Sequence, residues 1–401
     1  GTGPYMFDSM DIGRTITYRR NPDYWGKDLP INVGQNNFDT LRYEYFADGN
    51  AAFEGFKAGV YHFRIENSSK TWAESYNFPA VAAGHVKKDA LPSGAKANGQ
   101  GFVFNLRREV WQDPKVRQAI GLMFNFEWSN QTLFYGLYSR INSVWENTEM
   151  AATGAPTPEE VAILQPLVDE GLLPAGILTD EAVMAPTSGE RQLDRANLRK
   201  ASALLDEAGW TVGDDGKRRN AAGQPLKLEF LNASPQFDRI ITPFVENLIA
   251  LGVDARLENI DPAQYEARTR NPQYDFDIVT DNLRSAYFSG PELKQYYGSA
   301  TADVSVFNLA GLKSPAVDRL IDVVMAADTR EELTVATKAL DRVIRAEGYW
   351  IPQWYKAEHW AAYFDMYEHP EVIPPYALGV ESLWWYNAEK AEALKAAGAL
   401  K

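Results

Sequence analysis

The chain has 401 residues, 45% of them hydrophobic, which is long enough for two domains because single cores stop growing well below this length. Its 54 acidic and 40 basic residues give a formal net charge of -14. That balance argues against nucleic acid or an anionic membrane as the main partner, since phosphate binding needs a basic surface. Cysteine is absent, which excludes disulfides, thiolate metal sites and cysteine nucleophiles.

The first hundred residues are predicted to be mostly extended. Alternating patterns over 14–19 and 41–46 are typical of half-buried strands. The apolar run at 101–106 predicts a further strand. A short helix is expected over 50–59, where two phenylalanines lie at helical spacing and a glycine ends the pattern.

The pattern changes to helix at Asp113, which can cap, and Pro114, which fits the first helical position. Residues 148–194 are rich in proline, glycine and alanine and are expected to form an irregular surface excursion with short helical pieces. A helix over 197–209 follows. The next segment, 226–257, has a strand–helix–strand pattern, which implies two parallel strands joined by a crossover.

The last third is predicted to contain a strand at 276–280 and helices that begin near Ser314 and Thr329. Thr329 and Glu332 have the spacing of a capping box. An aromatic strand at 349–355 is expected to lead into a loop-rich end and a short helix of alanine and lysine.

The sequence contains few signs of catalysis. None of the four histidines has the spacing of a helical zinc site, and the glycine-rich phosphate-binding and nucleophile-elbow motifs are absent. No metal or cofactor is therefore predicted. Asp275 and Asp277 flank Phe276 on one face of a predicted strand, and glycosidases use two carboxylates. Solvated caps are the commoner explanation for such a pair, so a glycoside-active or other hydrolase is the alternative function; a chaperone-like protein is a third.

Four runs of sequence resemble the family 5 extracytoplasmic solute-binding proteins, which serve peptide and nickel ABC importers. These runs are GTGPY at 1–5, RNPDYW at 20–25, DPKVRQAI at 113–120 and ALLDEAGW at 203–210. Three finer features are similar to the YejA-like branch of that family, which is linked to oligopeptide and microcin C-type uptake. They are the segments 28–39, 147–149 and 351–355.

The resemblance implies an α/β protein with the two-lobed periplasmic-binding-protein-like fold of the cluster C type. Residues 1–105 and 356–401 are expected to form lobe I, and 106–355 lobe II. The similarity starts at a point that is internal in the family, so the N-terminal part of the first lobe is expected to be absent from this chain. The missing N-terminal segment of the same protein is accordingly an expected partner.

The function that the resemblance implies is that of a periplasmic receptor and not of an enzyme. Such a receptor captures a peptide or peptide-like ligand between two lobes and delivers it to the permease of an ABC transporter. The protein is expected to be a monomer and to bind no nucleic acid.

Ten residues are predicted to bind the ligand: Asn105, Asp281, Asn282, Arg284, Trp354 and Tyr355, followed by Phe102, Phe104, Asn125 and Trp128. Arg284 could pair with a carboxylate or phosphate, and the aromatic rings could stack on ligand groups. In oligopeptide-binding relatives an aspartate pairs with the peptide amino terminus, and Ala286 is aligned there. This departure favours a modified or differently oriented ligand, unless Asp281 takes that role.

Overall fold

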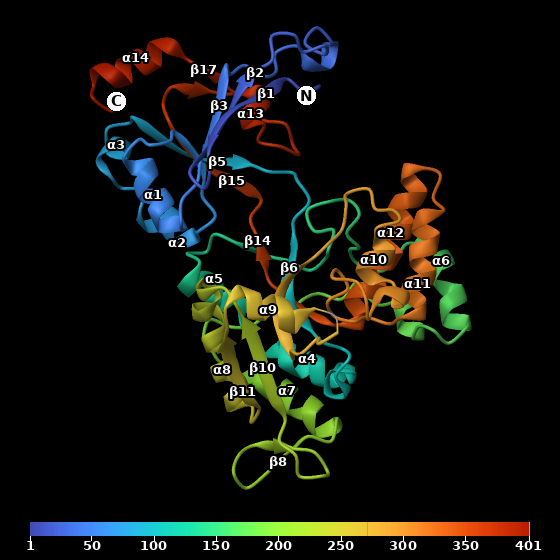
Figure 1. The fold of residues 1–401 in the computed structure, drawn as a ribbon. Coiled ribbons are helices and arrows are strands. Elements are labelled where there is room, and N and C mark those ends of the chain that lie inside the picture. The colour runs from blue at the N-terminus through green and yellow to red at the C-terminus, as the bar shows by residue number, and fades with distance from the viewer. Residues whose placement is uncertain (271, 401) are drawn as a thin grey trace. The chain divides into compact units, whose positions relative to one another are not determined.

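The protein is described from a computed structural model that covers residues 1–270 and 272–400 (Figure 1). Two compact units are present: Gly1–Ala95 with Ala357–Lys401, and Lys96–Lys356. The second unit is therefore a continuous insert in the first. Within the described ranges, every helix is too short or too polar to traverse a lipid bilayer.

The first unit contains three small antiparallel sheets. They are β1–β2–β3 (Tyr5–Asp11, Thr15–Arg20, Thr40–Glu44), β4–β15–β5 (Phe63–Ile65, Glu358–Phe364, Val86–Pro92) and β16–β17 (Tyr367–Glu368, Trp385–Tyr386). Its helices are α1 (Gly49–Lys57), α2 (Ser69–Glu74), α3 (Pro79–Ala82), α13 (Val380–Leu383) and α14 (Ala388–Ala396). The predicted helix at 50–59 and the C-terminal helix of alanine and lysine are thus confirmed.

The expectation of a loop-rich end after 355 is wrong for β15. This strand lies in the middle of its sheet, pairing with β4 on one edge and β5 on the other. Its last five residues are buried, so the run has the continuous apolar pattern of an interior strand and lacks the alternation of a surface strand. The buried Trp360 of β15 stacks on Trp72 of α2, with 5.6 Å between ring centroids.

The second unit is built on a five-stranded mixed sheet in the order β11–β10–β12–β6–β13. The strands are Asp254–Asn259, Lys227–Asn232, Ile278–Leu283, Gly99–Phe104 and Trp350–Pro352, respectively. Strand β10 runs parallel to β11 and β12, and β6 runs antiparallel to β12 and β13. The parallel pair predicted for 226–257 is therefore confirmed.

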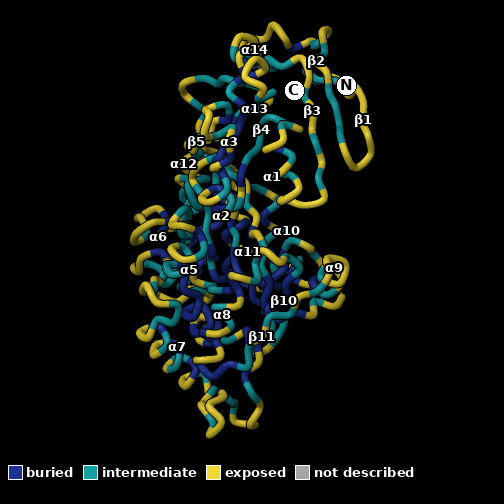
Figure 2. Tube along the Cα trace, turned by 90° about the vertical axis from the view of Figure 1, so that its left-hand side faces the viewer, coloured by how far each residue is buried: buried dark blue, intermediate teal, exposed yellow. Residues whose placement is uncertain are grey.

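Helices cover both faces of this sheet (Figure 1). They are α4 (Pro114–Leu122), α5 (Phe126–Leu133), α6 (Pro158–Asp169), α7 (Arg195–Glu207), α8 (Asp238–Ala250), α9 (Pro262–Thr269), α10 (Leu293–Tyr297), α11 (Pro315–Met325) and α12 (Arg330–Glu347). Because side chains alternate along a strand, Phe102 and Phe104 pack against α4 and α8, whereas Val103 packs with the side chains of α11 and α12. Figure 2 shows the resulting buried interior in dark blue.

The sheet also explains where the units divide. The predicted boundary lies after residue 105, whereas Lys96 already belongs to the second unit. Strand β6 is hydrogen-bonded along both edges, to β12 and to β13, so it cannot be separated from this core. The assignment of the two units as receptor lobes stays a prediction.

The segment 148–194 is not only an irregular surface excursion. It contains the twelve-residue α6, which buries Leu164 and Leu167 against the α12 side of the core. Glu160 of α6 is 2% exposed at its side chain and forms an ion pair with the equally buried Arg342 of α12. The capping box of Thr329 and Glu332 at the start of α12 is confirmed.

Candidate functional site

The candidate site lies at the carboxyl end of the five-stranded sheet. Strands β10, β11, β12 and β13 all run in the same direction and end at this edge. In open α/β sheets, ligands bind in the crevice outside the carboxyl ends of the strands. The predicted residues Asp281, Asn282 and Arg284 lie at or just after the end of β12, and Trp354 and Tyr355 form β14 directly after β13.

Four aromatic rings gather at this edge, and we call them the Trp354 cluster: Phe134, Tyr138, Phe237 and Trp354. The Trp354 ring stacks on Tyr138 and on Phe237, with centroid separations of 6.1 and 6.3 Å. Phe134, at the end of α5, is buried, and the other three rings are half-buried. Rings with one buried face and one accessible edge form an apolar wall that suits varied side chains.

The polar groups of this edge differ in exposure. Asn282 and Arg284 are exposed, whereas Asp281 is half-buried. Burial raises the pKa of Asp281, although the nearby cations Arg284 and Arg270 act to lower it. The guanidinium carbon of Arg284 lies 4.9 Å from the centroid of the Phe307 ring. An amide, a cation and a carboxyl group are thus available at one edge for hydrogen bonds to a polar ligand.

Gln353 joins β13 to β14 and is fully buried. Its side-chain oxygen accepts a hydrogen bond of 2.7 Å from Nε2 of Gln100, the register partner of Asn282. Its own Nε2 is buried without a partner. Buried amide donors are rarely left unpaired. The unpaired Nε2 of Gln353 is therefore a further polar feature of this edge.

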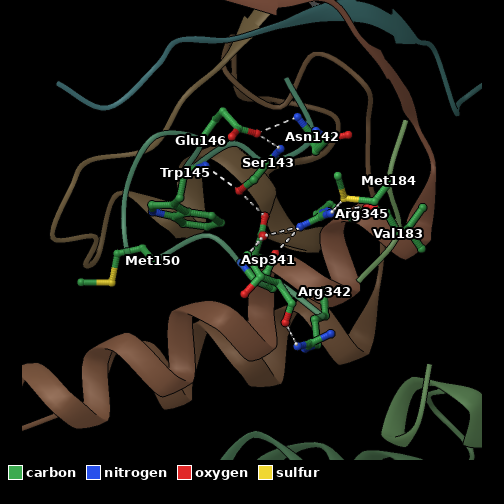
Figure 3. A network of polar contacts seen from close by, with 12 residues as sticks. Asn142, Ser143, Trp145, Glu146, Met150, Val183, Met184, Asp341, Arg342 and Arg345 are labelled. Carbon is green, nitrogen blue, oxygen red and sulfur yellow. Dashed lines mark hydrogen bonds and ion pairs between the residues drawn. The ribbon is translucent and has the colours of Figure 1, made fainter. Parts of the chain in front are cut away.

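Two-stranded pairing joins Trp354 and Tyr355 of β14 to β7 (Ser139–Arg140). The loop that follows β7 is held by α12 (Figure 3). Ser143 Oγ donates to the buried carboxylate of Asp341 at 2.8 Å, and the backbone N–H of Ala152 donates to the same carboxylate at 2.9 Å. Arg345 completes this network with an ion pair of 3.2 Å to Asp341. The backbone that carries β7 is therefore firmly anchored.

The structure does not bring Asn105 together with these residues. Asn105 follows the other end of β6, roughly 20 Å along the strand from Gly99 at ~3.4 Å per residue. Its side-chain amide donates to the carbonyl oxygens of Tyr274 and Phe276, at 2.8 and 3.0 Å. A hollow of about 500 Å³ adjoins Asn105 there, lined largely by charged groups such as Arg108. In this structure the side chain of Asn105 therefore has a structural role.

Of the four remaining predicted residues, three also have structural roles. Phe102 and Phe104 are fully buried in the core, so their rings are not available at a surface. Asn125 caps α5 by accepting from the N–H of Trp128, and its amide donates to the carbonyls of Gly189 and Arg191. Trp128 is half-buried on that helix.

Asp275 and Asp277 have a structural role in this arrangement. Both carboxylates accept from the guanidinium of Arg108, at 2.7 and 2.9 Å. Asp277 also accepts from the indole N–H of Trp111 and the backbone N–H of Glu229. Two carboxylates on one guanidinium do not face each other across a substrate, as a glycosidase requires. In the part of the chain that is described, no three histidine, aspartate or glutamate side chains gather as a metal site.

Sequence reasoning missed Tyr138, Phe237, Arg140 and Gln353 at the sheet end. Tyr138 and Arg140 follow a turn in which Tyr135 and Gly136 have positive φ angles of 60° and 70°. The turn glycine was the one local signal, and it does not reveal that the next residues pair with β14. The position of Ala286 is exposed, and its carbonyl accepts from the indole N–H of Trp145 at 3.2 Å.

Comparison with known proteins identifies the family. The model of the bacterial extracellular solute-binding proteins, family 5 Middle, matches residues 1–303. The chain is 42% identical over 388 residues to the "Probable peptide-binding protein YejA" of Agrobacterium fabrum, which covers 96% of this chain and 62% of that relative. The chain thus spans about three fifths of the length of the curated relatives that it matches.

Solved structures show the same fold. The oligopeptide-binding protein AppA of Bacillus subtilis, solved with a nonapeptide, superposes with a TM-score of 0.67 at 18% identity, covering 96% of this chain and 66% of AppA. NikA of Brucella suis, solved with Fe(III)-EDTA, gives 0.66 at 18% identity, covering 96% and 68%. One fold therefore serves different ligands. The chain itself belongs to the family 5 bacterial extracellular solute-binding proteins.

Proposed function

We propose that the protein is the solute-binding receptor of an ABC transporter and that it binds a peptide or peptide-like ligand without turnover. The Agrobacterium fabrum relative is named as a probable peptide-binding protein, and AppA was solved with a nonapeptide. In this chain, the observation that carries the proposal is the Trp354 cluster at the same end of the sheet as Asn282 and Arg284. Such an edge offers an apolar wall for side chains and hydrogen-bonding groups for a peptide backbone.

The proposal also covers the location and the partner of the receptor. We propose that it is a monomer in the periplasm and that it delivers its ligand to the permease of the transporter. The description of the family as extracellular supports a location outside the cytoplasm. Size-exclusion chromatography with light scattering tests the monomer, and a pull-down of the membrane fraction with ligand-loaded receptor tests the permease.

We also propose that an N-terminal segment of the same protein covers part of the first unit. Between residues 7 and 33 of this unit, six large apolar side chains are more than half exposed: Phe7, Met10, Ile12, Trp25, Ile31 and Val33. Large exposed apolar areas on a soluble protein commonly mark surfaces that another segment or partner covers. The dye ANS binds exposed apolar surface, so a longer version of the protein should bind less of it than residues 1–401. Equal dye binding contradicts the proposal that an N-terminal segment covers these side chains.

The function is tested by titrating the longest natural form of the protein with defined tripeptides and tetrapeptides. Ligand binding should change tryptophan fluorescence and raise the melting temperature, because a ligand that binds only the folded state stabilises it. Mass spectrometry of the peptides after incubation should show them intact. If none of these peptides raises the melting temperature, peptide binding is contradicted. Steady formation of peptide cleavage products contradicts a receptor without turnover.

A further inference from the structure

The side chain of Arg140 is unusual among the buried cations of the second unit. Its Nε, Nη1 and Nη2 atoms are all buried, and none of them has a hydrogen-bond partner. Burying a charge without a partner is costly, since the lost hydration is not replaced. Consistent with that cost, burial lowers the pKa of Arg140 to about 10, while the charge of Glu127 acts in the opposite direction.

The other buried arginines of this unit show what a satisfied guanidinium looks like. Arg117, Arg218, Arg342 and Arg345 are each no more than 6% exposed. Arg117 donates to four backbone carbonyls. The other three combine carbonyls with a carboxylate from Asp206, Glu160 or Asp341. The fold therefore pairs its structural arginines, and Arg140 is an exception.

Aromatic rings hold the Arg140 guanidinium without using its donors. The guanidinium carbon lies 5.1 Å from the centroid of the Phe124 ring and 5.2 Å from that of Phe126. A cation–π contact engages the face of the guanidinium and leaves its N–H groups free. Glu127 is engaged elsewhere, accepting from the backbone N–H of Ser188 at 3.0 Å.

The position of Arg140 connects it to the candidate site. Arg140 is the register partner of Trp354 in the β7–β14 pair, so it lies beside the Trp354 cluster. The residue as a whole is partly exposed, although its nitrogen atoms are covered. The loop after β7 is anchored on Asp341 through Ser143 and Ala152 (Figure 3). A change of side-chain rotamer, with the backbone fixed, is thus the movement that would expose the guanidinium.

We propose that Arg140 binds a carboxylate group of the ligand, which defines the ligand class as an acidic peptide or the free-acid form of a peptide. This inference rests on the proposed receptor function and deepens it. A planar carboxylate matches the fork of N–H groups and would satisfy the donors that the fold leaves unpaired. The carboxylate comes from the peptide C-terminus or from an acidic side chain, and the two sources require different probes.

Three peptides distinguish these sources: tetraalanine as the free acid, tetraalanine C-terminal amide, and Ala-Ala-Glu-Ala amide. Their dissociation constants are measured by calorimetry on the wild-type protein and on Arg140→Gln, in the longest natural form of the chain. The wild type should bind at least one carboxylate-bearing peptide about tenfold or more tightly than the neutral amide, since charge-assisted hydrogen bonds are worth that much. Arg140→Gln should lose this preference and bind the neutral amide as the wild type does.

The matched control is Arg219→Gln, which changes a surface arginine that pairs with Asp215. It should keep the wild-type preference. A preference that survives in Arg140→Gln overturns the assignment, and so does a wild type that binds all three peptides equally. If the wild type binds none of them, the peptide-receptor proposal itself is contradicted, and the assignment fails with it.

Thermal unfolding without peptide gives a readout that does not depend on binding. Because the substitution removes an uncompensated buried charge, Arg140→Gln should melt at or above the wild-type temperature at pH 7. A clearly lower melting temperature would mean that the guanidinium has an internal partner. That result contradicts the proposal that the Arg140 guanidinium is left unpaired for a ligand.

Discussion

Trp354 and Phe134 are in direct ring contact, with 4.5 Å between their centroids and 43° between their planes. Phe134 is buried at the end of α5, so it fixes one face of the indole, while Trp354 itself stays half-buried. The contact joins a residue just beyond the central sheet to a helix on its surface. It makes Trp354 a rigid part of the wall at the sheet end.

The substitution Trp354→Leu should weaken peptide binding about tenfold or more, because a rigid aromatic anchor at the centre of an interface commonly contributes that much. Calorimetry with a peptide that binds the wild type measures the change. The control is Trp385→Leu, which removes an exposed indole of β17. Equal losses in the two variants would show that the effect is not specific to the Trp354 cluster.

A close approach of strands leaves little room for a side chain at Gly101. A Cβ atom at this position would meet the ring of Trp350 and would lie 2.9 Å from the carbonyl oxygen of Ile351. Gly101→Ala should therefore reduce the free energy of unfolding by about 1–3 kcal/mol, as overpacking of a core does. Urea unfolding measures the loss, and Gly49→Ala is the control.

Gly49 begins α1, and a Cβ there meets nothing within 4 Å. Alanine at Gly49 should leave stability unchanged or raise it slightly, since alanine favours a helix. If Gly101→Ala is as harmless as Gly49→Ala, then β6 and β13 do not pack as closely as the structure shows.

Asp281 should make stability depend on pH. Burial raises its pKa in the folded state above the ordinary value of 3.8, so the folded protein holds this proton more tightly than the unfolded chain. The cost of the buried carboxylate is absent below pH 3.8, appears as the pH rises toward the folded-state pKa, and is fully present above that pKa. Asp281→Asn should therefore melt above the wild type at pH 7.

This advantage of Asp281→Asn should shrink as the pH falls toward 3.8, which melting curves across that range would reveal. The control variant is Asp214→Asn, which removes an exposed carboxylate. A constant difference at all pH values would indicate that the gain of Asp281→Asn has another cause than its charge.

Glu160 should be among the most sensitive positions of the second unit. Its ion pair with Arg342 is buried on both sides, and breaking such a pair typically costs about 3–5 kcal/mol because it leaves an uncompensated charge. Glu160→Gln should show a loss of this order in urea unfolding. Glu170→Gln breaks the exposed pair with Arg319 and should cost less than about 1 kcal/mol. Similar losses would contradict the difference in burial.

The elements that could be predicted from the sequence are those with local signals. Leu228 and Phe230 alternate in β10, and Thr329 with Glu332 forms a cap whose two bonds span only three residues. Strand β15 could not be predicted in this way. Its buried, continuous apolar run has no alternation, and both of its partner strands lie far away in the chain.

The candidate site was predictable only in part for the same reason. Trp354 stands out as an aromatic residue after a strand, but its contacts with Tyr138 and Phe237 arise from tertiary packing. Asn105 was assigned to the site, but the structure places it elsewhere. Its position at the end of β6 is correct, yet only the strand directions show that this end is opposite to that of Trp354.

The insertion of the second unit into the first has a consequence for protein engineering. Its entering and leaving segments are adjacent, because Gln353 N–H donates to the carbonyl of Gln100 at 3.0 Å. The first unit shows the same adjacency, since Ser93 N–H donates to the carbonyl of Ala357 at 2.9 Å. The first unit could therefore be closed by a short linker between Ala95 and Ala357, whereas the second unit is already one continuous segment. We therefore expect the second unit, about two thirds of the chain, to fold by itself, and expression of residues 96–356 tests this.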